Sequence, residues 1–176
     1  MHRHLILAAA LCALAAGAAL AQTPYAGMES RPIKALSDQQ IADLKAGRGM
    51  GLALAAELNG YPGPSHLLEL AGQLGLSDDQ KGQVQALFDT MKAETVPIGE
   101  RLISQEAALD ALFSGHTATP EAIAAATAAI GDTQGKLRAA HLKYHLSTVA
   151  LLQPAQVRRY AELRGYSNGE PHHHPR

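Results

Sequence analysis

The chain has 176 residues, a formal net charge of −1 at pH 7 and 47% apolar residues. This length suits one domain, and the near-neutral charge argues against a nucleic-acid-binding protein, whose surface is strongly basic. The single cysteine, Cys12, lies in an apolar N-terminal run, so the rest of the chain has neither disulfides nor thiol chemistry. Aromatic residues are only 4% of the chain, which favours helices packed through Ala and Leu over a thick globular core.

Residues 1–21 have the pattern of a secretory signal peptide. A basic start at residues 1–4 precedes an apolar run over residues 5–20, and Ala-Leu-Ala at residues 19–21 resembles a cleavage site. The run is short for a permanent transmembrane helix, although an uncleaved anchor is the alternative. We therefore expect these residues to be removed on export and the protein to be periplasmic.

Residues 22–64 form the next predicted unit, an N-terminal arm with short helices. Residues 22–35 show no periodicity, whereas Ser37 is a natural N-cap for a short helix. Three glycines in segment 47–51 then interrupt the helical pattern, and we expect a kink or a close backbone contact there. A phosphate-binding loop is disfavoured because no strand precedes the segment and no Gly-Lys-Ser/Thr ending follows it.

Residues 65–166 are predicted to form the main domain, an elongated antiparallel helical hairpin with flanking shorter helices. Segment 77–113 places apolar residues at three- and four-residue steps, and segment 120–152 repeats them every seven residues. A five- or six-residue turn joins the two segments, which is typical of an antiparallel pair. No strand pattern is present in the sequence, so the predicted fold class is all-α. The flanking helices are expected at residues 66–74 and 154–164.

The starts of the two long helices carry clear signals. Ser77 and Thr119 are favoured N-cap residues, and a proline follows Thr119 at the first helical position. Pro97 lies inside the first long helix, where it removes a backbone N–H. We therefore expect a kink near residues 93–97.

Charge divides unequally between the two long helices. Residues 78–110 include seven acidic and three basic side chains, a net charge of −4, whereas residues 136–164 include six basic and one acidic, a net charge of +5. Two explanations are open: the arms of one hairpin attract each other, or two subunits pair head to tail as a homodimer.

Residues 167–176 end the chain with three consecutive histidines, His172 to His174, between prolines. We expect this tail to be disordered. It is either a native metal-binding tail or the remnant of a purification tag, and neither reading supports a structured site.

Two histidines one helical turn apart, His141 and His145, are the principal candidate site. Such a pair is a common way to present two imidazoles to zinc, copper, nickel or cobalt. If the hairpin turn is centred near residues 116–117, Met91 and Glu94 lie near the pair on the opposite helix. Their thioether and carboxylate would complete a set suited to a borderline transition metal. The alternative is that both histidines simply pack against a neighbouring helix or a partner subunit.

Enzyme signatures are missing from the sequence. It contains no Ser/His/Asp grouping, no close carboxylate pair and no cofactor fingerprint, so we predict that it is not an enzyme, has no catalytic residues and requires no cofactor. A transition metal ion at the histidine pair is the one alternative left open. Glu57 and segment 47–51 are the only remaining positions at which catalytic chemistry could be sought. His66 and His116 are expected to be plain surface residues.

Three predicted helix starts share one pattern, a leucine followed four residues later by a glutamine. They lie at residues 36–40, 76–80 and 152–156. The second and third, about 75 residues apart in an exported and helical chain without further cysteines, resemble the Spy/CpxP family. That family of periplasmic proteins is named for two L-T-x-x-Q motifs and includes the metal-associated relatives ZraP and CnrX. Ser77 and Gln153 stand where the family has threonine.

The resemblance covers roughly residues 67–164 and implies a thin helical hairpin that dimerises antiparallel into a curved cradle. Spy-like members hold unfolding periplasmic proteins without ATP, and CpxP-like members damp a membrane stress-sensor kinase. CnrX-like members bind nickel or cobalt through His, Glu and Met and signal to a membrane partner.

From this resemblance we predict a periplasmic ATP-independent chaperone or envelope stress-response adaptor. A periplasmic heavy-metal-binding sensor or buffer that uses the histidine pair is the alternative. The expected partners are unfolded or stress-damaged periplasmic proteins, or the periplasmic domain of a membrane sensor.

Overall fold

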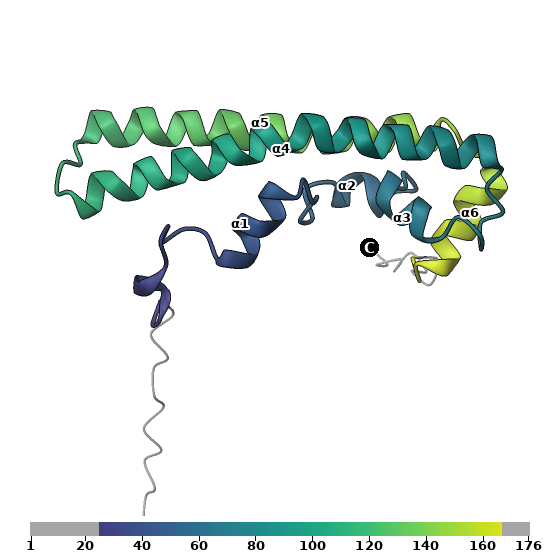
Figure 1. Ribbon diagram of the computed structural model, residues 1–176, viewed down its shortest axis with the longest axis horizontal. Coiled ribbons are helices and arrows are strands. Elements are labelled where there is room, and N and C mark those ends of the chain that lie inside the picture. Colours follow the sequence, from purple (N-terminus) through teal and green to yellow (C-terminus); the bar gives the residue numbers. More distant parts are fainter. Residues whose placement is uncertain (1–24, 167–176) are drawn as a thin grey trace, which may run out of the picture.

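The computed structural model describes residues 25–166, and all regular structure in this range is helical. Two long helices, α4 (Asp78–Ser114) and α5 (Pro120–Val149), form an antiparallel pair (Figure 1). The all-α prediction and the long hairpin are thereby confirmed. The predicted signal peptide and the His-rich tail lie outside the described residues. The shorter helices are η1 (Met28–Ser30), α1 (Asp38–Lys45), α2 (Leu54–Glu57), α3 (Pro64–Glu69) and α6 (Pro154–Leu163).

The predicted helix starts form as expected because the cap residues satisfy backbone N–H groups that lack an intrahelical partner. The Ser77 hydroxyl accepts a hydrogen bond from the Gln80 backbone N–H at 3.1 Å, and the Gln80 side chain accepts one from the Ser77 N–H at 3.0 Å. Thr119 accepts from the Ala122 N–H at 3.2 Å at the start of α5. These local bonds fix where each long helix begins.

The glutamines of the second and third leucine–glutamine motifs also bind each other. Gln80 donates to the Gln156 side-chain oxygen at 2.9 Å, and Gln156 donates back to the Gln80 oxygen at 3.1 Å. Gln80 donates a further bond to the Leu151 carbonyl at 2.8 Å. The amide pair therefore joins the start of α6 to the start of α4.

Pro97 does not end the long helix. α4 continues through it as one helix from Asp78 to Ser114, and Figure 1 shows its axis bending near the middle. No helix within residues 25–166 is both long and apolar enough to cross a membrane.

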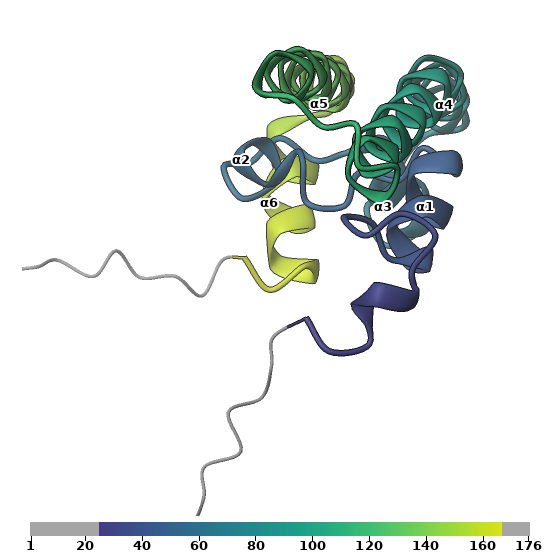
Figure 2. The same ribbon diagram turned by 90° about the vertical axis from the view of Figure 1, so that its left-hand side faces the viewer.

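The shorter helices lie along one side of the hairpin, with α1 and α3 against α4 and α2 against α5 (Figure 2). The arm before the hairpin thus contributes to the core. One apolar cluster joins Ile33, Leu36 and Leu44 of the arm to the two long helices. A second joins α3 and the start of α4 to Tyr160 of α6.

Close backbone contacts explain two glycines where the arm meets α4. A Cβ at Gly99 would lie 2.6 Å from the Leu44 carbonyl oxygen, so the end of α1 sits directly on α4 at that point. Gly47 follows with φ +66°, and a Cβ there would lie 2.8 Å from the Thr95 hydroxyl. The close backbone contact expected for segment 47–51 is confirmed.

Replacing Gly99 by Ala should destabilise the protein because its methyl group collides with the Leu44 backbone, which cannot turn away as a side chain can. We expect a loss of roughly 1–3 kcal/mol in the free energy of unfolding, measured by urea denaturation. Gly82→Ala in the same helix is the matched control, since a Cβ there meets no atom within 4 Å. That change should be neutral or stabilising by up to about 1 kcal/mol. Equal effects of the two substitutions would contradict the packing described for α1.

Candidate functional site

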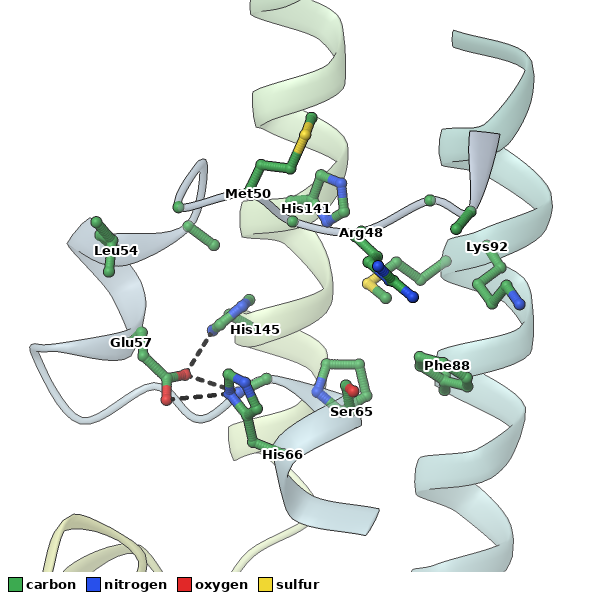
Figure 3. A pocket seen from close by; sticks show the side chains of 18 of the residues that line it. Arg48, Met50, Leu54, Glu57, Ser65, His66, Phe88, Lys92, His141 and His145 are labelled. Carbon is green, nitrogen blue, oxygen red and sulfur yellow. Dashed lines mark hydrogen bonds and ion pairs between the residues drawn. The ribbon is translucent and has the colours of Figure 1, made fainter. Parts of the chain in front are cut away.

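A cavity of about 570 Å³ lies between the hairpin and the segment of residues 46–69 (Figure 3). Its walls come from the glycine-rich loop, α2 and α3 on one side and from α4 and α5 on the other. Both candidate histidines of α5 line it. A volume of this size is typical of ligand sites in proteins.

The two histidines are buried in the cavity wall, His141 with 2% and His145 with 8% of its surface exposed. Nδ1 of His145 lies 2.6 Å from the Tyr61 carbonyl oxygen, which can only accept a hydrogen bond, so Nδ1 carries the proton. In the neutral imidazole, Nε2 of His145 then holds the free lone pair.

His141 has a different environment. Its Nε2 is buried and has no hydrogen-bond partner in the described part of the chain. Burial lowers the pKa of His141, and the neighbouring His145 lowers it further, so the imidazole is neutral at physiological pH. A buried polar atom without a partner is costly, so this nitrogen calls for a partner such as an ordered water or a bound ion.

Glycines face both imidazole rings. A Cβ at Gly63 would lie 2.8 Å from Nε2 and Cε1 of His145, and one at Gly49 would lie 3.7 Å from Nδ1 of His141. The main chain thus approaches His145 so closely that a side chain at position 63 would displace the ring.

A buried carboxylate, Glu57 of α2, lies at one end of the cavity with 5% of its surface exposed. It accepts hydrogen bonds from the Tyr160 hydroxyl, from the Tyr166 hydroxyl at 3.1 Å and from the Gly63 N–H at 3.2 Å. These donors come from two separate parts of the chain, the start of α3 and the region of α6, so the charge on α2 is satisfied only when both are in place.

Nitrogen-bearing side chains surround the same carboxylate. Figure 3 shows Glu57 between two histidines, with Nδ1 of His66 at 3.3 Å and Nδ1 of His145 at 3.7 Å from its oxygens. Nε of Arg164 lies 3.8 Å away. Burial raises the pKa of Glu57, but the hydrogen bonds from His66 and Tyr160 and the attraction to His66 outweigh it and hold the pKa at about 2.

The four ligands predicted from the sequence do not all meet. His141, His145 and the buried Met91 line the cavity. Glu94 is not among the lining residues. Its carboxylate accepts hydrogen bonds from Lys143 at 2.6 Å and from the Tyr144 hydroxyl at 2.7 Å, and the bond from Lys143 lowers its pKa most. This contact is an ion pair across the hairpin, as attraction between its oppositely charged arms predicts.

The sequence did not reveal the acidic side of the site. His66 was expected to be a plain surface residue, yet it lines the cavity beside Glu57. The only available signal was Glu57 itself, the one charged residue in the apolar stretch 52–58.

Over residues 25–166 no group of three or more His, Cys, Asp or Glu side chains is arranged to hold one metal ion. Among the four predicted ligands, the three that line the cavity carry imidazole nitrogens and a thioether sulfur.

A family model for heavy-metal resistance proteins matches residues 46–159. The chain belongs to this heavy-metal resistance family. The family comprises periplasmic proteins of the Spy, CpxP, ZraP and CnrX type, which confirms the resemblance drawn from the helix-start motifs. The match begins at the glycine-rich loop, so the cavity lies within the family's own domain, whereas the sequence resemblance began only near residue 67. Curated proteins and solved structures give no match.

Acid should destabilise the fold through Glu57. Because its pKa is about 2 in the folded protein against an ordinary 4.5, its contribution is complete above 4.5 and is lost as the pH falls towards 2. We expect Glu57→Gln to be less stable than the wild type near neutral pH, and this difference to shrink by up to about 3 kcal/mol between pH 5 and pH 2. Urea denaturation across this range measures it. Glu69→Gln, at an exposed carboxylate of the same cavity, is the control and should track the wild type. A constant difference between wild type and Glu57→Gln would contradict the assignment.

Proposed function

We propose that this heavy-metal resistance protein binds a divalent transition-metal ion in the periplasm through His141 and His145, as a sensor or buffer of the metal. The observation that carries the proposal is Nε2 of His141, which is buried in the cavity wall and lacks a hydrogen-bond partner throughout residues 25–166. His145 one turn away has its other nitrogen occupied by the Tyr61 carbonyl, an arrangement typical of metal-binding histidines.

The donor set supports a borderline metal over a hard one. Imidazole nitrogens and a thioether favour zinc, copper, nickel or cobalt, whereas magnesium and calcium require oxygen ligands. Met91 supplies the thioether, and water would complete the coordination. The proposed role is reversible binding of the ion and not catalysis.

Calorimetric titration of zinc, copper(II), nickel and cobalt into the mature chain tests the proposal. The three tail histidines, His172 to His174, are replaced by Ala in every sample so that only the cavity is measured. We expect micromolar or tighter binding of at least one ion, weakened at least about 100-fold by His141→Ala/His145→Ala because two of its ligands are lost.

His116→Ala is the matched control, since it removes an imidazole from the exposed hairpin turn and should leave the affinity unchanged. Met91→Leu keeps the packing volume and should weaken binding less than loss of a histidine. If no ion binds, or if affinity survives the double substitution, the proposal is wrong.

A second candidate function, the ATP-independent chaperone or stress adaptor predicted from the sequence, is favoured by exposed apolar side chains in the segment of residues 50–61. Met50, Leu54, Leu58 and Tyr61 lie within twelve consecutive residues and are 42%, 53%, 57% and 40% exposed. Apolar side chains grouped in this way suit weak contacts with many clients. The proposed partners are damaged periplasmic proteins or the periplasmic domain of a membrane sensor, bound by a homodimer.

An aggregation assay tests this second function. A chemically denatured client should stay in solution with an equimolar amount of the protein, and Leu54→Ser/Leu58→Ser should reduce the protection because it removes the apolar contact. Phe113→Ser, at an equally exposed position beside the hairpin turn, is the control and should retain it. Unhindered client aggregation in the presence of the wild type would reject the chaperone role.

A further inference from the structure

The Glu57 carboxylate connects the histidine cavity to the last helix of the described chain. On the cavity side it lies 3.7 Å from Nδ1 of His145 and 3.3 Å from Nδ1 of His66. On the other side it accepts hydrogen bonds from the hydroxyls of Tyr160 in α6 and Tyr166 just beyond it. One buried anion is therefore shared between a proposed metal ligand and α6.

The position of Glu57 depends on these partners because its own helix is too short to hold it. α2 has only four residues, and its N-cap is Ala53, whose side chain has no oxygen to cap the helix. Glu57 is the last residue of α2, so hydrogen bonds from α6 and from Gly63 determine where its carboxylate lies.

Glu57 in turn affects His145. The negative charge stands on the Nδ1 side of the ring, where the proton is held by the Tyr61 carbonyl. A carboxylate on that side makes the opposite nitrogen a better donor to a cation and fixes the ring orientation. Displacement of Glu57 would remove both effects, although none of the proposed metal ligands would itself be altered.

We propose that Glu57 is a positioning residue for the histidine site, and that α6 sets the metal affinity of this site through the Tyr160 hydroxyl. The inference rests on the proposed metal-binding function and adds its regulation. Coupling of this kind is reciprocal: if docking of α6 strengthens metal binding, metal binding must stabilise the docking of α6 by the same factor.

Zinc is the probe for the first test, titrated into the full mature chain with the tail histidines replaced by Ala. Tyr160→Phe keeps the buried ring and removes only the hydroxyl that holds Glu57, and Tyr160 is not a cavity-lining residue. We expect zinc affinity to fall about 5-fold or more in Tyr160→Phe and about 10- to 100-fold in Glu57→Gln. Arg159→Ala is the control on the same helix, because Arg159 pairs with the exposed Glu162 and should not affect the site.

Hydrogen exchange supplies a readout that a purely structural role of Tyr160 would not change. In the wild type, zinc should slow amide exchange of residues 154–163, and in Tyr160→Phe, at zinc concentrations that saturate it, this slowing should be lost. The wild-type measurement needs no substitution, so it holds even if a variant folds poorly.

The outcomes separate the metal site from its regulation. Zinc binding that is equally tight in wild type and Tyr160→Phe, or zinc binding without any change of exchange in α6, overturns the regulatory inference and leaves the metal site standing. A wild-type protein that binds none of the four ions overturns the proposed function and this inference together.

Discussion

The buried negative charge of Glu57 is the constraint on which the arrangement around the hairpin depends. A carboxylate in the protein interior must be matched by donors or cations, because an unpaired one costs several kcal/mol. The partners of Glu57 come from α3, from α5, from α6 and from the loop at Gly63. Moving any one of these segments away would remove a partner of the Glu57 carboxylate. The two long helices supply the length of the molecule, and Glu57 determines how the shorter elements are fitted against them.

The helices themselves could be predicted from the sequence because their signals are local. Ser77 and Thr119 cap the two long helices through bonds to residues three positions away, and apolar spacing extends each helix from there. The packing of the N-terminal arm against the hairpin could not be predicted in this way. Nothing in the sequence pattern sets Gly99 apart, and only the structure shows that the Leu44 backbone lies against it. Contacts between residues more than fifty positions apart leave no periodic trace in one sequence.

The candidate site shows the same division. His141 and His145 could be found because an i, i+4 pair lies on one helical face, and Met91 because the length of the hairpin turn sets the approximate register. The register estimate is too coarse to separate Met91 from Glu94, which lies one turn away and binds Lys143 instead. Glu57 joins the site through contacts to α5 and α6, almost ninety and more than one hundred residues later in the chain. In the sequence, a charged residue in an apolar stretch is equally consistent with an exposed surface position and with a buried site residue. Only the burial seen in the structure distinguishes these two possibilities.

The amide pair of Gln80 and Gln156 has a consequence for the order in which the molecule opens. Its bonds join neutral groups and therefore do not respond to acid, whereas the far end of α6 is held by bonds to the ionised Glu57. The contact at the start of α6 therefore does not depend on pH, whereas the contact near its end does. On acidification, local opening should therefore begin at the Tyr160 end and swing α6 about its first turn, while the hairpin stays intact.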